Sequence, residues 1–498
     1  MKKIFVLVFS SLVIALSVTA QSLEQKIKEF DAYIEKSRQD WRAPGMAVAV
    51  VKDGKVLLQK GYGVRELGKE NKVDAQTLFS CASTTKAMTA VCMGMLVDEG
   101  KIKWEDRVID YLPEYQLYDP TTTRELRILD LFLHNSGVGN ADYLWTFMDI
   151  PAKEMLDRMR LVKPSYSLRS SFIYQNLFYV AAGEVIEKVS GKPWEAFIQE
   201  KIFTPLGMNR TAPKRKYIKD NNQVVPHYEV NKKIKPITYT QDHAIGSAGS
   251  VWSSAEDMAK WMICMLDSSK YAGGRLLKPA TWAKMFKPAT LVPDAEFYPT
   301  QQLTHPNWTT YALGWFQQDY KGKKINFHTG SLAGLTAIHA QLPDYKLGIY
   351  VFGNFDHAEV RHALMYKAFD WFALGGTTDW NKDFLNLYSK IFAKVEKGEK
   401  DFEAKRVMNT SPSLPLADYT GKYSDPLYGE FEITLKDNTL LIDLNHFEKA
   451  MLEHWHYNTF RGPYEKDWYG KATANFILDA TGKVSKIDFE GMELTKVK

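Results

Sequence analysis

The sequence predicts an α+β fold: an antiparallel sheet flanked by helices, followed by a small C-terminal β domain of barrel or sandwich type. Strand patterns occur near both ends of the first 374 residues, with helical patterns between them. From residue 416 onward, short alternating strands rich in aromatic residues indicate a separate β domain. With 498 residues, 45% hydrophobic and 25% charged, the chain can bury a large core in more than one domain.

The first twenty residues are typical of an export signal. Two lysines precede an apolar run at residues 4–18, and a small-residue cleavage site lies before Gln21. The run is too short for a stable membrane span, and no cysteine follows the cleavage site to carry a lipid. We therefore expect a periplasmic or secreted protein with no stable membrane span after signal removal.

Charge and cysteine content exclude several classes of partner and of scaffold. The formal net charge of +5 is small for this length and the charges are interspersed, so we expect no nucleic-acid partner. The three cysteines, Cys81, Cys92 and Cys264, are an odd number, so disulfides cannot be the main support of an exported fold. The partner we expect is a small molecule or peptide.

The elements of the first domain follow from periodicity and turn residues. Residues 22–41 have helical spacing, and residues 46–51 and 56–59 form a hairpin around Asp53-Gly54. An almost wholly apolar helix follows, with Ser83 placed to cap it and Gly100 at its end.

Later elements complete this sheet and connect it to the second domain. We expect a helix at residues 177–189, and we expect helix caps at the serines of residues 253–258. Three strands and a final helix are expected at residues 325–330, 334–342, 347–352 and 357–372. The predicted organisation is a signal at 1–20, a first domain at 21–374, a helical linker at 375–415 and a β domain at 416–498.

Ser83 and Lys86 form the first candidate site. One helical turn separates them, so the hydroxyl and the amine can touch. A serine is a poor nucleophile until a neighbour takes its proton, and a lysine can do so only as the neutral amine. Burial in an apolar helix and the positive end of the helix dipole would both lower the lysine pKa. The alternative is that Ser83 is only a cap and Lys86 a surface cation.

Two further motifs favour catalysis over that alternative. Residues 83–86, 174–176 and 328–330 read Ser-Thr-Thr-Lys, Tyr-Gln-Asn and His-Thr-Gly. In this order they resemble the active-site motifs of the serine β-lactamase and penicillin-binding-protein superfamily, in particular its class C branch. The resemblance spans about residues 24–374. It implies a β-lactamase/transpeptidase-like sheet with an all-helical subdomain, and the C-terminal module resembles a lipocalin-like barrel.

The resemblance assigns a role to each motif residue. It implies that Ser83 is the nucleophile, that Lys86 shares its proton, and that Tyr174 acts as base and then as acid. Whether Lys86 or Tyr174 is the general base stays open. Asn176 would hold the substrate amide, although it could be only a helix cap.

The third motif would bind the substrate backbone. His328, Thr329 and Gly330 are expected on an edge strand, to which a substrate can add as a further strand. The backbone N–H groups of Ser83 and Ser331 would form the oxyanion hole. Histidine rather than lysine at residue 328 is similar to the carboxypeptidase and D-aminopeptidase members, and a histidine is only partly charged near neutral pH.

These observations predict an exported serine hydrolase of the D-alanyl-D-alanine carboxypeptidase or D-aminopeptidase type. A β-lactamase or carboxylesterase on the same site is the alternative, and a penicillin-binding sensor that is acylated without turnover is a third reading. The substrate would be a small peptide, amide, ester or β-lactam. We expect no cofactor and no metal, and the C-terminal domain can shape the site entrance or a homo-oligomer.

Overall fold

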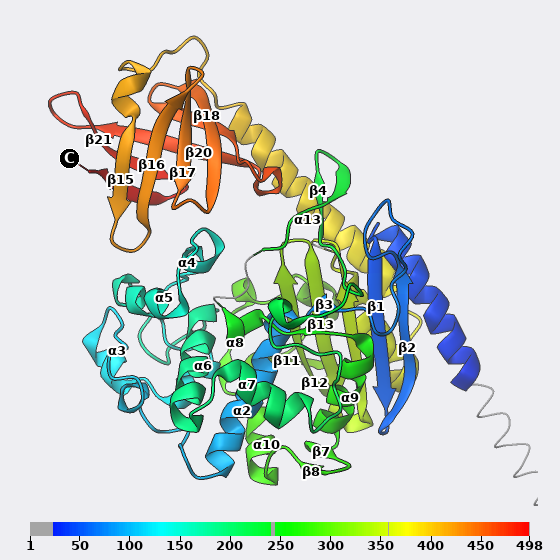
Figure 1. Ribbon diagram of the computed structural model, residues 1–498. Coiled ribbons are helices and arrows are strands. Elements are labelled where there is room, and N and C mark those ends of the chain that lie inside the picture. Colours follow the sequence, from blue (N-terminus) through cyan, green and yellow to red (C-terminus); the bar gives the residue numbers. More distant parts are fainter. Residues whose placement is uncertain (1–22, 241–244, 357, 498) are drawn as a thin grey trace, which may run out of the picture.

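The computed structural model describes residues 23–240, 245–356 and 358–497. An α/β body carries a closed C-terminal barrel, and helix α13 (Trp380–Glu403) runs from the body to the barrel (Figure 1). The predicted α+β fold class is thereby confirmed. The predicted export signal at residues 1–20 lies outside the described residues. Within those residues, no helix combines the length and the apolar character that a membrane crossing requires.

The body is built on one antiparallel sheet of eight strands. Its spatial order is β2-β1-β14-β13-β12-β11-β10-β9. The strands are β1 (Gly45–Lys52), β2 (Lys55–Gly63), β9 (Thr290–Leu291), β10 (Thr309–Ala312), β11 (Trp315–Tyr320), β12 (Lys323–Leu332), β13 (Leu335–Leu342) and β14 (Leu347–Gly353). Because β1 pairs with β14, the first and last strands of the domain lie side by side, as the sequence predicts.

The N-terminal hairpin shows why the chain starts this sheet. Asp53 and Gly54 both have positive φ, 49° and 74°, which is the backbone of a tight two-residue hairpin turn. Strand β1 is buried on both faces. Val48 and Val50 join the core beneath the N-terminal helix, and Ala47 and Ala49 join the core of the opposite layer.

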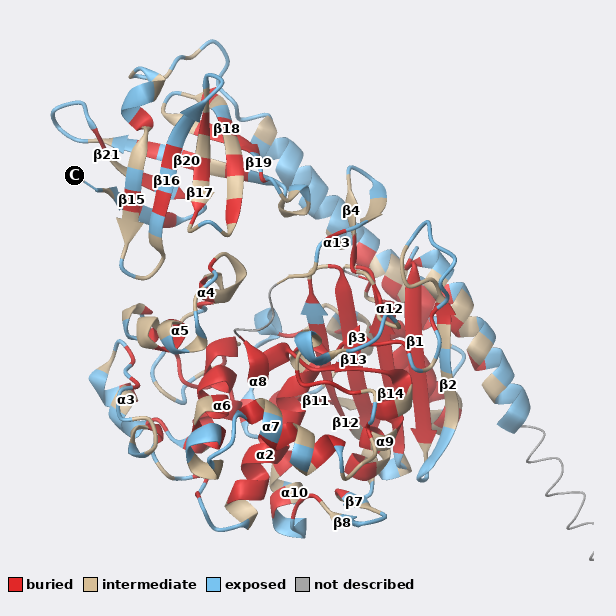
Figure 2. Ribbon diagram, viewed as in Figure 1, coloured by how far each residue is buried: buried red, intermediate tan, exposed pale blue. Residues whose placement is uncertain are grey.

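Helices cover both faces of the sheet. The N-terminal helix (residues 23–40), α12 (Val360–Phe369) and the start of α13 pack on one face, and α9 (Ala255–Leu266) and α2 (Thr85–Asp98) lie on the other. Figure 2 shows the inner strands of the sheet, α2 and α12 buried, whereas the edge strand β2 and most of α13 are more exposed. Helix α2 is therefore the inner element of its layer: its first twelve of fourteen residues are buried.

The remaining helices of this layer form a largely helical region beside α2. They are α3 (Pro120–Glu125), α4 (Tyr143–Thr146), α5 (Ala152–Arg158), α6 (Asn176–Ser190), α7 (Trp194–Ile198), α8 (Gly246–Gly249) and α10 (Pro279–Met285). The short helix α11 (Gln301–Thr304) lies on the other face of the sheet, where Leu303 packs against the core that contains α12. Three short pairs complete the body: β3 (Phe79–Ser80) with β6 (Trp252–Ser253), β4 (His227–Val230) with β5 (Lys233–Pro236), and β7 (Lys270–Tyr271) with β8 (Gly274–Arg275).

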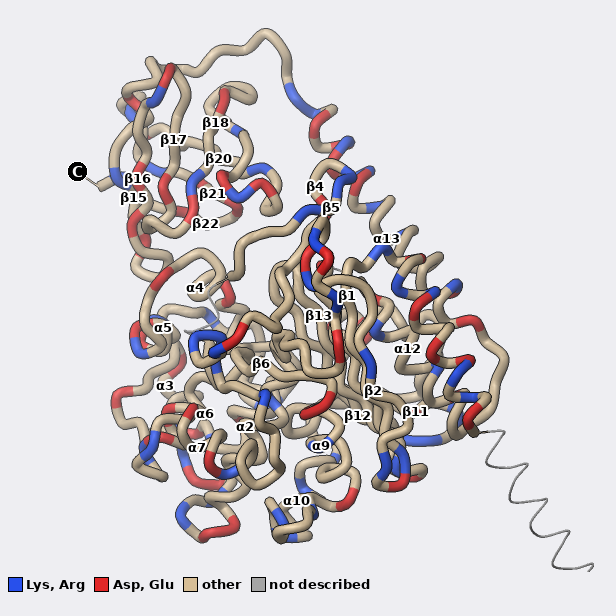
Figure 3. Tube along the Cα trace, turned by 45° about the vertical axis from the view of Figure 1, so that its right-hand side comes forward, with Lys and Arg blue, Asp and Glu red and all other residues tan. Residues whose placement is uncertain are grey.

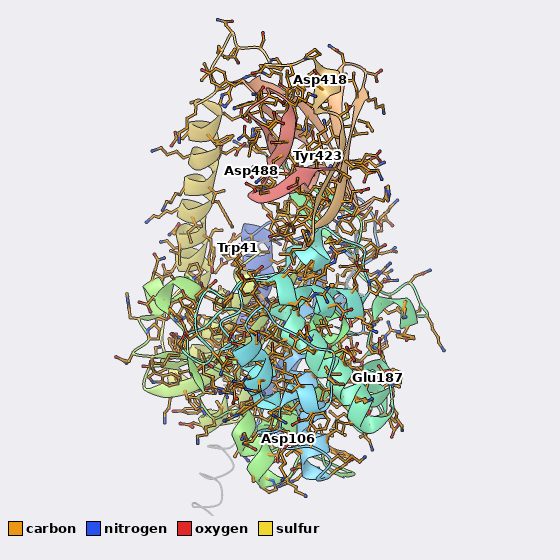
Figure 4. All side chains as sticks on the ribbon, turned by 90° about the vertical axis from the view of Figure 1, so that its left-hand side faces the viewer. Trp41, Asp106, Glu187, Asp418, Tyr423 and Asp488 are labelled. Atoms are coloured by element: carbon orange, nitrogen blue, oxygen red, sulfur yellow. The ribbon has the colours of Figure 1, made fainter. Side chains whose placement is uncertain are left out.

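The C-terminal domain is a closed eight-stranded barrel. Its strands are β15 (Gly421–Asp425), β16 (Gly429–Lys436), β17 (Thr439–Leu444), β18 (Glu448–His456), β19 (Thr459–Pro463), β20 (Lys471–Leu478), β21 (Val484–Phe489) and β22 (Met492–Lys496). Closure pairs β15 with β22, so no edge is left open. Figure 4 shows Tyr423 and Asp488 in this barrel and Trp41 near the opposite end of α13. There the Trp41 indole donates to Asn381 of α13 over 2.9 Å.

Two parts of the barrel hold it to the rest of the chain. On one side Arg461 pairs with Glu399 and Glu403 of α13. On the other side the barrel rests on the helical region: Arg158 of α5 donates to the Leu427 carbonyl over 2.8 Å. Charges of both signs are interspersed over the described part of the chain, including α13 (Figure 3). The docking of the barrel against α5 thus uses specific contacts rather than one charged surface.

Candidate active site

Ser83 lies in a tight turn between β3 and α2. A 3-10 turn spans Ala82–Thr84, and Ala82 has a φ of 44°, a left-handed conformation that alanine rarely adopts. The predicted role of Ser83 as helix cap is wrong: Thr84 occupies the cap position, and its side chain makes no capping hydrogen bond. The strained turn instead places the Ser83 hydroxyl beside the first turn of α2, and strain of this kind clusters at functional sites.

Lys86 is a fully buried amine with three polar neighbours. Its Nζ donates to Asn176 Oδ1 over 2.7 Å, to the Ala248 carbonyl over 3.0 Å and to Ser83 Oγ over 3.1 Å. The surface-cation alternative for Lys86 is therefore wrong. Two of the three neighbours only accept hydrogen bonds, whereas a hydroxyl can also donate. A neutral amine here would keep both acceptors satisfied and turn its lone pair toward Ser83.

The environment of Lys86 favours that neutral form. Burial lowers the pKa of Lys86 to about 7, and the Asp142 carboxylate opposes this shift. The Nζ lies 4.9 Å from the centre of the Tyr174 ring and 5.3 Å from that of Tyr179. At neutral pH a substantial fraction of Lys86 is thus available to accept a proton.

Tyr174 has the opposite tendency. Burial raises its pKa well above the usual value of 10, and a hydrogen bond with the Ser83 side chain only partly offsets this effect. The phenolate is therefore strongly disfavoured near neutral pH. His134 packs against the Tyr174 ring with centroids 4.3 Å apart and fixes the ring in place. Of the two groups, Lys86 is the one whose pKa lies close to neutral pH.

Asn176 begins α6 and connects the lysine to a carboxylate. The N-cap of α6 is Gln175, so Asn176 is not the capping residue. While its Oδ1 accepts from Lys86, its Nδ2 donates to Asp142 Oδ1 over 3.0 Å. Both ends of the amide are occupied, so its orientation is determined by its partners. In this structure Asn176 holds the lysine rather than facing an empty position.

The predicted edge strand needs correction. Strand β12 is internal in the sheet, between β11 and β13. Its pairing with β11 stops at Phe316–Phe327, whereas its pairing with β13 continues to Leu332–Leu335. Residues 328–332 are therefore paired on one side only, because β11 ends early. The edge that a substrate backbone could use is this half of β12.

His328 is buried and neutral, which also differs from the expectation of partial charge. Burial lowers its pKa to about 3, and the charge of Lys86 adds to the shift. Its Nε2 lies 2.9 Å from the Tyr311 hydroxyl and its Nδ1 2.6 Å from the Thr329 carbonyl. The side chain of Thr329 in turn contacts the Tyr298 hydroxyl at 2.7 Å. His328 thus supports the strand and brings no positive charge to the site.

Gly330 lets the strand touch the serine turn. A Cβ at this position would lie 2.2 Å from the Cys81 carbonyl and 3.1 Å from the Ser83 nitrogen. Arg361 of α12 stabilises the same piece of strand: it donates to the Gly330 carbonyl over 2.5 Å and to Ser331 Oγ over 3.0 Å. Because β12 packs closely on this turn at Gly330, the backbone of the next residue, Ser331, lies near the turn that carries Ser83.

A cavity of about 260 Å³ opens beside Ser331. It is lined by Trp145, Thr146, Thr240, Ser331, Leu332, Ala333, Asp356, Phe447 and Tyr469. Phe447 and Tyr469 belong to the barrel, so the two domains build this cavity together. Its large side chains are mostly aromatic, which suits an apolar group.

Some residues of the site carry no signal in the sequence. The side chains of Asp142 and Arg361 contact motif residues, yet neither residue belongs to a motif. Likewise, nothing in the sequence places the ring of His134 on that of Tyr174. Among the described residues, no group of three or more His, Cys, Asp or Glu side chains is arranged to hold a metal ion.

Comparison with known proteins agrees with this geometry. A family model described as Beta-lactamase matches residues 30–369, and one described as a domain of unknown function, DUF3471, matches residues 405–497. An unguisins hydrolase of Aspergillus campestris (strain IBT 28561) is 27% identical over 437 residues, covering 84% of this chain and 79% of the relative.

Two further proteins extend the comparison. The N-acetylmuramyl-L-alanine amidase of Bacillus subtilis (strain 168) is 25% identical over 392 residues, covering 69% of this chain and 84% of the relative. The octameric penicillin-binding protein homologue from Pyrococcus abyssi has a similar fold, with a TM-score of 0.64 at 22% identity. That likeness covers 94% of this chain and all of the homologue, so it includes the barrel.

Proposed function

The chain belongs to the β-lactamase family, and from this membership we propose that it is a serine hydrolase that cleaves a peptide or amide through an acyl-enzyme on Ser83. The observation that carries the proposal is the contact of the buried Lys86 amine with Ser83 Oγ at 3.1 Å. Hydrolase and amidase relatives support the reaction class.

The proposed reaction starts with proton transfer to Lys86. Ser83 Oγ attacks the substrate carbonyl carbon as its proton moves to the neutral amine. The negative oxygen that develops accepts hydrogen bonds from the backbone N–H groups of Ser83 and Ser331, donors typically worth about 3 kcal/mol each. The C–N bond then breaks, and the leaving amine takes up the proton through the Tyr174 hydroxyl. Water hydrolyses the ester on Ser83 by the same proton route in reverse.

The neutral state of His328 supports substrates without a carboxylate at this position. A β-lactam or a peptide with a free C-terminus presents a carboxylate, which a cation normally binds. Arg361 is close, but it is only 5% exposed and already pairs with Glu359 and the strand carbonyls. Within the proposal, a D-aminopeptidase or amidase activity therefore ranks above carboxypeptidase and β-lactamase activity.

The cavity beside Ser331 supports an apolar group on the substrate. Trp145, Phe447 and Tyr469 would contact it, and a volume of about 260 Å³ is enough for one large side chain. The proposed substrate is thus an amide or peptide with a bulky apolar residue near the scissile bond. An ester of the same acyl group would react on the same site.

Labelling with a fluorophosphonate, followed by mass spectrometry of the modified peptide, tests the nucleophile. We expect labelling of Ser83 in the wild type and none in Ser83→Ala, with Ser136→Ala as a control for loss of another serine hydroxyl. A label that persists in Ser83→Ala would refute the proposal.

A substrate panel ranks the activities. D-amino-acid amides, peptides with and without a free C-terminus, p-nitrophenyl esters and a chromogenic cephalosporin would be compared by kcat/KM. We expect amides and peptides with apolar residues to be cleaved fastest. Fast turnover of the cephalosporin alone would favour a β-lactamase, and a persistent adduct without product would favour a sensor.

We also propose that the protein works outside the cytoplasmic membrane, because its first twenty residues have the features of an export signal. Assembly through the barrel is a further part of the proposal, since the structurally similar penicillin-binding protein homologue is described as octameric. Fractionation of cells and light scattering of the purified protein would test these two points.

A further inference from the structure

Asp142 lies just before α4, outside every recognised motif, yet it contacts the catalytic machinery. Its Oδ1 accepts a hydrogen bond from Asn176 Nδ2 over 3.0 Å, and the same oxygen accepts from the Trp145 indole over 2.8 Å. Asn176 in turn accepts from Lys86, and Trp145 lines the cavity beside Ser331. One carboxylate oxygen therefore connects the lysine to the wall of the cavity.

We propose that Asp142 is a positioning residue that orients the Asn176 amide toward Lys86. Because Asp142 is joined to α4, this orientation depends on docking of the barrel against α4. This inference rests on the proposed function, since it assigns Asp142 a role in the same acylation reaction. Asp142 itself touches neither Ser83 nor Lys86 in any described contact, so it acts through Asn176.

Asp142 determines which way the Asn176 amide faces. An asparagine side chain can present either its oxygen or its nitrogen to a neighbour. Asp142 can only accept, so it binds the Nδ2 group and leaves Oδ1 for Lys86. A flipped amide would place two oxygens together at Asp142 and two donors together at Lys86, which is unfavourable at both ends. The carboxylate thus selects the productive arrangement.

The negative charge of Asp142 also acts on Lys86 and raises its pKa. The groups that face Lys86 are the hydroxyl-bearing rings of Tyr174 and Tyr179, the imidazoles of His134 and His328, and Asp142. Burial keeps both tyrosines protonated and both histidines uncharged near neutral pH. Among these groups Asp142 therefore carries the one charge that acts on the lysine at neutral pH, and a negative charge favours protonated Lys86.

The segment that carries Asp142 packs against the barrel. The aromatic rings of α4 and of the residue after it pack on barrel residues: Tyr143 lies 6.2 Å from Tyr428, and Phe147 lies 5.5 Å from Tyr469, between ring centroids. The Asp142 carbonyl accepts from the backbone and side chain of Thr146, so residue 142 is part of the same turn. The barrel thus supports the segment that carries Asp142.

The test measures the rate of Ser83 acylation by a fluorophosphonate from pH 5 to pH 9. Asp142→Asn keeps an oxygen that can accept from Asn176 and Trp145 but removes the charge. We expect its pH midpoint to move about half a unit lower, so that the rate at pH 6, divided by the rate at pH 8, rises about 2.5-fold. Asp142→Ala removes the acceptor as well, and we expect a loss of at least about tenfold at every pH.

Asp157→Asn, which removes the same charge from α5 of the same region, is the matched control and should leave the midpoint unchanged. Thermal melting of all variants separates loss of folding from loss of positioning. A midpoint unchanged in Asp142→Asn, or wild-type acylation in folded Asp142→Ala, would overturn the inference while the proposed function stands. A wild type that is not labelled at Ser83 would overturn the proposed function and this inference together.

Discussion

Lys86 shows how burial turns an ordinary residue into a candidate base. Its amine makes three contacts inside a helix layer where nearly every neighbour is apolar, and burial lowers its pKa to about 7. The two fixed acceptors, Asn176 Oδ1 and the Ala248 carbonyl, leave one direction for the lone pair. In the proposed reaction, the reactivity of Ser83 therefore depends on residues from three different segments of the chain.

A pH–rate profile tests whether Lys86 is the general base. Below about pH 7 Lys86 is protonated and cannot accept the serine proton, so we expect kcat/KM to fall about tenfold per pH unit on the acid side. On the alkaline side the rate should reach a plateau, because the pKa of Tyr174 lies well above 10. A profile that rises only above pH 9 would instead assign the base to Tyr174.

Gly330 gives a second prediction at this scale. In Gly330→Ala the new Cβ would collide with the Cys81 carbonyl and the Ser83 turn, both of which are backbone that cannot move aside cheaply. We expect a loss of about 1–3 kcal/mol in the free energy of unfolding, measured by denaturant titration, together with strongly reduced acylation of Ser83.

Gly348→Ala in strand β14 is the matched control for this change. Its Cβ would meet the ends of the Leu266 and Met262 side chains at 3.0 and 3.3 Å, and these can shift. Equal acylation rates in the two variants would show that contact between β12 and the serine turn is unimportant.

At the scale of elements, the geometry of the site depends on β11, α12 and α4. The pairing of β11 with β12 stops at Phe327, so residues 328–332 of β12 pair with β13 alone. Helix α12 holds this part of β12 through Arg361, and α4 links the helical region to the barrel. The four residues of α4 are too few to be stable alone, so the helix depends on what packs around it.

Phe147→Ala tests the dependence of α4 on the barrel. The variant loses ring contacts with Tyr464 and Tyr469, and with them the support of the turn that carries Asp142. We expect Ser83 acylation to slow about threefold to tenfold, with faster proteolysis near residues 140–150 in a limited digest. Val395→Ala on α13, a residue 67% exposed, is the control and should change neither measurement. Acylation at the wild-type rate in Phe147→Ala would show that barrel docking is irrelevant to the chemistry.

At the scale of the whole molecule, the fold is held together without disulfides. Cys81, Cys92 and Cys264 are all buried and unpaired. Burial raises the pKa of Cys81 and of Cys264 to about 12, so these thiols are unreactive at neutral pH. Stability therefore comes from three hydrophobic cores, one on each side of the sheet and one inside the barrel.

A reductant should accordingly leave thermal stability unchanged. We expect the same Tm with and without dithiothreitol, and no rapid reaction of the folded protein with a thiol reagent. Three thiols should titrate after unfolding in denaturant, which serves as the internal control. A drop in Tm under reducing conditions would contradict the unpaired state of these cysteines.

Local patterns were enough to predict much of this architecture. The Asp53-Gly54 turn, the apolar helix after Ser83 and the alternating strands beyond residue 416 are properties of neighbouring residues, and each appears in the structure close to its expected place. The three motifs predicted which residues would meet. The structure brings Ser83, Lys86 and Tyr174 together, with Asn176 beside them, whereas their catalytic roles remain proposals.

Neighbouring residues were enough to predict the elements, their order and the motif residues that carry the hydroxyl and the amine, and the apolar helix predicted the direction in which the pKa of Lys86 shifts. The partners of these groups and the neutral state of His328 follow only from the packing of distant segments. Burial sets the neutral state of His328 and the lowered pKa of Lys86, and burial depends on distant segments packing together. Asp142, Arg361 and the barrel residues Phe447 and Tyr469 reach the site only through such packing, because no local pattern records a contact between segments far apart in the chain.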